Sequence, residues 1–138
     1  MGRPPKLNSK TYHKYVACCD LYITITFRER DNKPYECFIQ AKASTLPDEI
    51  IDGKEIRKNK KIKGGCSALQ QGLAELVTIT LQNDKLEETI DSLRQIKCNA
   101  CDRIKGKFPQ EYKKVICFSC PDAIGRVLEN WVDEDSKK

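Results

Sequence analysis

Four of the eight cysteines lie in the last third of the chain and follow the spacing C-x2-C-x15-C-x2-C; they are Cys98, Cys101, Cys117 and Cys120. Two residues between thiols allow one turn to present both sulfurs to the same ion, and the long spacer allows a hairpin that returns the second pair. Four thiolates complete a tetrahedral shell, so we expect a structural Zn²⁺ with no open position for water. Reduced structural cysteines or a redox pair are the alternatives that the same spacing permits.

The N-terminal half predicts a β-hairpin. Residues 15–30 alternate apolar and polar side chains and are rich in β-branched residues, and residues 35–41 follow turn-forming residues. Residues 42–63 are polar, with Pro47 and Gly53, and we interpret them as a loop or insertion with room for one short strand.

Helical periodicity dominates the second half. Residues 64–83 predict a helix with one apolar face, and residues 86–96 predict a second. The apolar face of the first consists of Leu69, Leu73, Leu76, Val77 and Leu81. After the Cys98–Cys101 knuckle, residues 103–116 predict a short hairpin. Ser119 then caps a last helix, with Pro121 and Asp122 in its first turn.

These elements predict an α+β fold, a small antiparallel sheet packed by helices, with a treble-clef-like zinc module at residues 97–132. Residues 1–14 form a basic arm, residues 15–132 one domain, and residues 133–138 a polar tail. With 39% apolar and 33% charged residues the composition is that of a globular protein. No apolar run is long enough to cross a membrane, and no apolar segment follows the basic N-terminus, so we expect a cytoplasmic protein.

The net charge of +5 is concentrated in two stretches. The arm carries Arg3 and Lys6, and Gly2-Arg3-Pro4 is similar to the core of a minor-groove hook. The second stretch, residues 54–63, carries Arg57, Lys58, Lys60 and Lys61. Clustered cations attract phosphates, so these residues are candidates for DNA contact, although a solvated tail and loop have the same composition.

A glycine pair precedes the first helix, in the sequence Gly64-Gly65-Cys66-Ser67. Exposed backbone N–H groups and the helix dipole favour an anion at such a position, which makes this turn a candidate phosphate site. The alternative is that the glycines permit close packing and that Cys66 is a small buried residue.

Three motifs occur in the order expected for one family. They are Gly64-Gly65-Cys66-Ser67-Ala68-Leu69-Gln70, Leu93-Arg94-Gln95-Ile96-Lys97-Cys98 and Phe118-Ser119-Cys120-Pro121-Asp122-Ala123-Ile124. Together they resemble the TSCPD domain family, with Phe118 at the position of the threonine. This domain occurs at the C-terminus of adenosylcobalamin-dependent ribonucleotide reductases and in small stand-alone proteins, some from phages. The resemblance implies a link to deoxynucleotide or DNA metabolism.

The resemblance does not imply the reductase reaction, because 138 residues cannot contain the catalytic barrel of that enzyme. Our first hypothesis is a non-catalytic, zinc-stabilised module that binds a reductase-type protein, a nucleotide or nucleic acid. The second is a thiol-redox protein that supplies electrons to a ribonucleoside-diphosphate reductase through Cys98/Cys101 or Cys117/Cys120. The third is a phage protein that sequesters a host molecule in the host cytoplasm.

Overall fold

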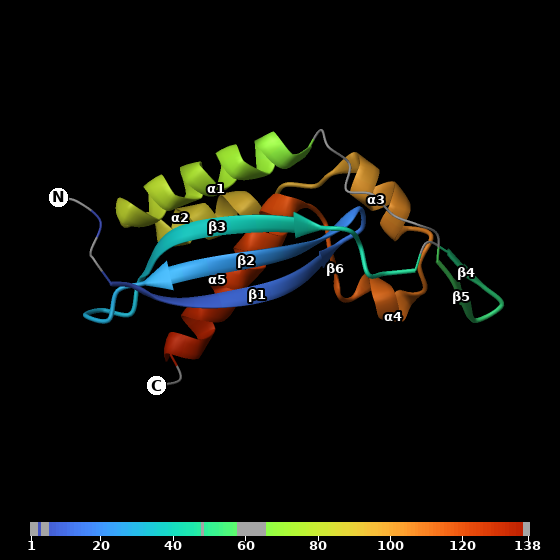
Figure 1. The fold of residues 1–138 in the computed structure, drawn as a ribbon, viewed down its shortest axis with the longest axis horizontal. Helices are drawn as coiled ribbons and strands as arrows, with labels where there is room; N and C mark the ends of the chain where they lie inside the picture. The colour runs from blue at the N-terminus through green and yellow to red at the C-terminus, as the bar shows by residue number, and fades with distance from the viewer. Residues whose placement is uncertain (1–2, 4–5, 48, 58–65, 137–138) are drawn as a thin grey trace.

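The computed structural model describes residue 3 and residues 6–47, 49–57 and 66–136 (Figure 1). Its main sheet has four strands in the order β3-β2-β1-β6. β1 (Asn8–Val16), β2 (Cys19–Phe27) and β3 (Pro34–Lys42) form an antiparallel meander, and β6 (Ile116–Cys117) pairs in parallel with β1. The predicted hairpin is therefore confirmed as β2 and β3, but the sheet is mixed rather than purely antiparallel.

Within the described ranges, the remaining elements are a small hairpin and five helices. β4 (Glu49–Ile51) and β5 (Lys54–Ile56) pair within the segment that the sequence indicated as a loop. Asp52 and Gly53 join them with φ of 51° and 78°, as the tight turn of a two-residue hairpin requires. The helices are α1 (Ser67–Gln82), α2 (Leu86–Arg94), α3 (Asn99–Lys105), α4 (Gln110–Lys113) and α5 (Cys120–Ser136).

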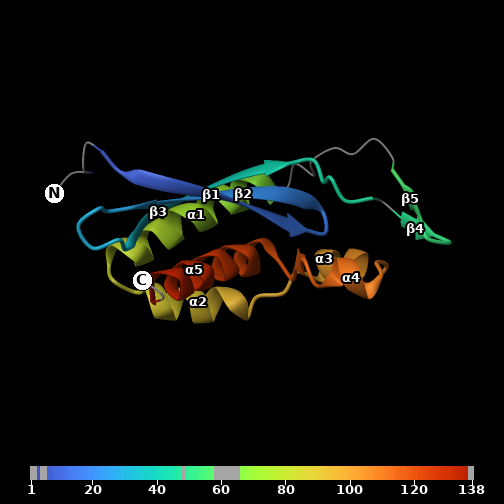
Figure 2. The ribbon, with the colours of Figure 1, turned by 90° about the horizontal axis from the view of Figure 1, so that it is seen from below.

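The core lies between the sheet and α5. Alternate side chains of β2, Leu21, Ile23 and Ile25, are fully buried, because a strand places every second residue on one face. On the opposite side of the core α5 contributes Ile124, Val127 and Leu128, which are also fully buried. Figure 2 shows α5 and α2 below the sheet, with α1 lying along β3. The α+β class predicted from the sequence is confirmed.

Two predictions about the second half are wrong. Residues 103–116 form α3 and α4 instead of a hairpin, since Asn99–Lys105 continues as a helix from the knuckle and Pro109 starts the next one. The buried face of α1 is also rotated from the predicted one. Gln70, Ala74, Val77 and Leu81 are buried, whereas Leu69 and Leu76 are 75% and 63% exposed.

Residues 8–14, which the sequence assigned to a flexible arm, form most of β1. Their register with β2 runs from Asn8 opposite Phe27 to Lys14 opposite Leu21. The side chains of this strand are mostly polar and half-buried or exposed, so the stretch lacks the apolar alternation by which strands are recognised. These residues form a strand because their backbone pairs with β2, although their side-chain pattern does not indicate one.

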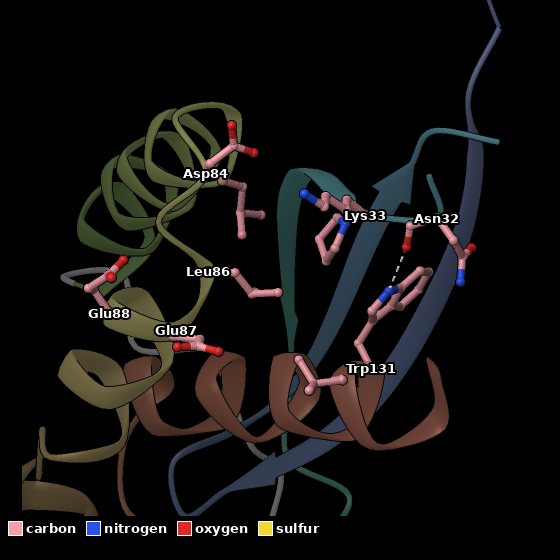
Figure 3. Close-up of a pocket in the computed structure, with 10 residues that line it drawn as sticks. Asn32, Lys33, Asp84, Leu86, Glu87, Glu88 and Trp131 are labelled. Atoms are coloured by element: carbon pink, nitrogen blue, oxygen red, sulfur yellow. Dashed lines mark hydrogen bonds between the residues drawn. The ribbon is translucent and has the colours of Figure 1, made fainter. Parts of the chain in front are cut away.

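Trp131 fixes the end of the molecule opposite the cysteines. Its Nε1 donates a hydrogen bond of 3.0 Å to the carbonyl oxygen of Asn32 in the β2–β3 turn (Figure 3). Asn32 has a positive φ of 56°, and the Trp131 ring packs on Phe27 with centroids 4.7 Å apart. The indole therefore connects α5 to a strained turn of the sheet.

Replacing Trp131 by Phe keeps most of the apolar contact and removes this donor. We expect Trp131→Phe to lower the free energy of unfolding by about 1–2 kcal/mol, because a hydrogen bond is lost and some packing goes with the smaller ring. Urea denaturation followed by circular dichroism measures the change. Val132→Ala, at a partly exposed neighbour, is the control and should change stability by less than about 0.5 kcal/mol. Equal values for the two variants would contradict this role of the indole.

Candidate functional site: the cysteine junction

Three segments that are distant in sequence bring five thiols together at one end of the sheet. The β1–β2 turn contributes Cys18 and Cys19, the start of α3 contributes Cys98 and Cys101, and the start of α5 contributes Cys120. We call these five residues the cysteine junction. Figure 1 shows the β1–β2 turn pointing toward α3 and the short strand β6.

Sulfur contacts connect the members of the cysteine junction. The Sγ atoms of Cys18 and Cys101 lie 3.6 Å apart. Hydrogen bonding with Cys98 also acts on the pKa of Cys101, and hydrogen bonding with Cys18 and Cys120 acts on the pKa of Cys19. The contacts thus run from α3 through the β1–β2 turn to α5.

The pKa values of the junction thiols are shifted in opposite directions. Hydrogen bonds to Cys120 and Cys18, followed by burial, raise the pKa of Cys19. A hydrogen bond to Cys18 and burial raise the pKa of Cys101 in the same way. The pKa of Cys120 is lowered, first because Cys19 donates to its sulfur and also because Gln70 Nε2 donates from 3.3 Å, although burial opposes both. The surroundings therefore favour the thiolate of Cys120 and the protonated thiols of Cys19 and Cys101.

Cys117, the remaining member of the predicted zinc set, occupies a different environment. It is buried in β6 opposite Val16, and the charged groups nearest its sulfur are Arg126, Asp122, Lys14 and Lys105. Burial raises its pKa. Cys117 lies in β6 and Cys120 in the first turn of α5, so the two residues of this C-x2-C come from different elements. The structure brings together Cys98, Cys101 and Cys120, and adds Cys18 and Cys19.

The side chains as they lie do not form a ready coordination shell. Within the described ranges, no group of three or more His, Cys, Asp or Glu side chains is arranged to hold a metal ion. Cys18 and Cys19 are not among the site residues that the cysteine spacing predicts. Their adjacency at the end of a strand was the available signal, but only the fold shows that this turn meets α3 and α5.

The first turn of α5 is held by a hydrogen-bond network around Ser119 and Asp122. Ser119 Oγ accepts from the backbone N–H of Asp122 at 2.9 Å and donates to the carbonyl of Ile96 at 2.6 Å. This confirms the predicted cap. The fully buried carboxylate of Asp122 accepts from the N–H of Phe118 at 2.9 Å and from Arg126 Nε at 3.0 Å, and it pairs with Arg94. Through its ion pair with Arg94 of α2, Asp122 therefore joins α2 to α5.

The structure describes three of the predicted nucleic-acid residues, Arg3, Lys6 and Arg57, and the two arginines have partners within the protein. Arg3 Nε forms an ion pair of 2.9 Å with Glu36. Arg57 donates to the carbonyl of Thr45 and pairs with Glu55 at 3.0 Å. Lys6 is exposed, whereas Lys58, Lys60 and Lys61 lie outside the described residues.

Half of the predicted phosphate turn also falls outside the described part of the chain, at Gly64 and Gly65. Cys66 is exposed at the N-cap of α1, and Ser67 is the first residue of that helix. Among the described helices, none is long and apolar enough to cross a bilayer.

The mixed sheet, its helical cover and the thiol-rich corner define a small α+β module. The family model for the TSCPD domain matches residues 3–132, which is nearly the whole chain, and the chain therefore belongs to the TSCPD domain family. This domain is associated with ribonucleotide reductases. No curated protein and no solved structure matches the chain.

Proposed function

We propose that this chain is a non-catalytic binding module linked to deoxynucleotide and DNA metabolism, and that zinc stabilises its cysteine junction. The association of TSCPD domains with ribonucleotide reductases supports the metabolic link. The state of the buried acids supports a non-catalytic role. Asp122 is saturated by two arginines and a backbone N–H, and Asp20 by His13 and Thr45, so neither carboxylate is available to a substrate.

The meeting of thiols from three segments is the observation that carries the zinc proposal. In a tetrahedral site with Zn–S bonds of about 2.3 Å, neighbouring sulfurs lie about 3.8 Å apart. The 3.6 Å between Cys18 and Cys101 is close to this value. We assign Cys18, Cys98, Cys101 and Cys120 as the ligands, and Gln70 as a donor to the Cys120 sulfur from outside the shell.

Two single substitutions separate this ligand set from the one that the sequence spacing predicts. We expect Cys117→Ser to retain about one zinc per chain and Cys18→Ser to lose it. The zinc affinity of Cys18→Ser should fall by more than about 100-fold, because the loss of a ligand weakens binding more than the loss of a residue that only hydrogen-bonds to a ligand. Metal analysis of the purified variants by mass spectrometry measures the stoichiometry. The reverse result, with zinc kept by Cys18→Ser and lost by Cys117→Ser, would favour the set Cys98, Cys101, Cys117 and Cys120.

The same sulfurs support a second candidate, a thiol-redox accessory protein. The 3.6 Å contact would let Cys18 and Cys101 form a disulfide with a small movement. Two thiols would then lose two electrons and two protons, and a disulfide on a reductase-type partner would gain them. Thiol titration of the native protein distinguishes the candidates: zinc leaves the four ligands unreactive, whereas a redox pair is metal-free and reversibly oxidised.

A further inference from the structure

A concave pocket of about 450 Å³ lies between α3, α4 and the residue that leads into α5. Lys105, Lys113 and Lys114 line it together with the ring of Phe118 and with Asp102. We call it the lysine pocket. It is separate from the cysteine junction and from the phosphate turn predicted at residues 64–67.

Cations crowd around the Phe118 ring at the pocket wall. Lys105 Nζ lies 3.9 Å from the ring centroid, Lys97 Nζ lies 5.4 Å away, and the guanidinium carbon of Arg126 lies 5.6 Å away. The ring face attracts a cation, but one aromatic ring does not neutralise three positive charges. Two further ammonium groups, on Lys113 and Lys114, belong to the same pocket.

Few carboxylates balance these charges. Asp122 pairs with Arg126 but is shared with Arg94. Among the described residues, no carboxylate forms an ion pair with Lys97, Lys105, Lys113 or Lys114. Asp102, on the pocket wall, is the one acidic residue that lines it.

Lys105 is the most constrained of these cations. It is only 8% exposed, and its Nζ donates a 2.7 Å hydrogen bond to the carbonyl of Ile116. Burial and the neighbouring Arg126 lower the pKa of this ammonium group. A nearly buried ammonium group without a carboxylate partner is costly, and an anion in the pocket would relieve that cost.

We propose that the lysine pocket binds the phosphate chain of a nucleoside triphosphate. Lysine ammonium groups act as point charges for phosphate oxygens, and the three lysines that line the pocket, with Lys97 beside the Phe118 ring, suit the three to four negative charges of a triphosphate. Their convergence on a concavity favours a compact phosphate chain over a nucleic-acid backbone, which requires an extended row of contacts. This inference rests on the proposed link to deoxynucleotide metabolism and gives that function a ligand site.

Isothermal titration at constant low ionic strength tests the pocket with dATP, inorganic tripolyphosphate and a single-stranded oligodeoxynucleotide. We expect dATP and tripolyphosphate to bind, and Lys113→Gln/Lys114→Gln to weaken both by about tenfold or more. The control, Lys33→Gln/Lys85→Gln, removes two exposed lysines elsewhere and should leave the affinities unchanged.

The proposal is overturned if neither phosphate compound binds at millimolar concentration, or if the two double variants behave alike. It is also overturned if the oligodeoxynucleotide binds more tightly than dATP and loses more affinity in Lys113→Gln/Lys114→Gln, since the pocket would then serve backbone phosphates. Zinc content measured on the same samples separates this result from the proposed function, because both double variants should keep their metal.

Discussion

Removing zinc with a chelator lowers the melting temperature by more than about 10 °C. A metal that binds only the folded state at about a thousand times its dissociation constant contributes about 4 kcal/mol, and each kcal/mol shifts the transition of a domain this size by about 3–5 °C. We expect a large effect because the proposed metal would link the β1–β2 turn, α3 and α5, three segments that are distant in sequence. Differential scanning fluorimetry with and without chelator measures the shift.

Besides lowering the melting temperature, removal of zinc should increase the local mobility of the chain near the cysteine junction. The core residues Leu21, Ile23, Ile25 and Leu128 lie along the sheet and α5, although Cys19 and Cys101 of the junction belong to the same buried cluster. We expect faster amide exchange at residues 98–105 after chelation, with the central strands still protected. Cys66→Ser, at an exposed cysteine outside the junction, is the control and should respond to chelator like the parent chain. A chelator-insensitive melting temperature in both proteins would contradict the metal assignment.

Asp122→Ala lowers the free energy of unfolding by about 3–5 kcal/mol, the second large effect that we expect. The carboxylate is fully buried and pairs with Arg94 and Arg126, so its removal leaves two guanidinium groups without their shared counter-charge. The N–H of Phe118 also loses its acceptor. Because the same carboxylate joins α2 to α5, both helices should loosen together. Chemical denaturation measures the loss.

Glu129→Gln provides the matched control for Asp122→Ala. Glu129 pairs with the same Arg94 at 3.0 Å, but its side chain is 42% exposed. Exposed ion pairs contribute about 0–1 kcal/mol, so the two carboxylates on one arginine should differ several-fold in effect. A loss for Asp122→Ala no greater than that for Glu129→Gln would show that the buried network is not a main support of α5.

The sequence predicted those elements that are specified by residues within the element itself. The Ser119 cap, the helices α1 and α2 and the β2–β3 hairpin follow from capping residues, helical spacing and alternation, and the structure has all of them, although α2 ends at Arg94, two residues before the predicted end. β1 was predicted poorly because its order comes from pairing with β2 and not from its own polar side chains. The buried face of α1 depends on how the helix rests on β3, which the sequence does not contain.

The candidate site required tertiary information for a similar reason. The spacing of the last four cysteines predicted that Cys98, Cys101, Cys117 and Cys120 meet, and the first, second and fourth of these lie at the cysteine junction, at the starts of α3 and α5. It also included Cys117, which β6 carries into a separate buried environment beside Asp122 and Arg126. Cys18 completes the sulfur contacts from a turn eighty residues upstream, and no spacing rule connects residues so far apart.

X-ray absorption at the zinc K-edge of the purified protein tests the cysteine junction most directly. Four sulfur scatterers at about 2.3 Å, lost in Cys18→Ser and kept in Cys117→Ser, are the predicted result. A protein purified without zinc, or a zinc spectrum fitted by nitrogen and oxygen ligands, would contradict a thiolate site. Either result would favour the second candidate function, a thiol-redox accessory protein.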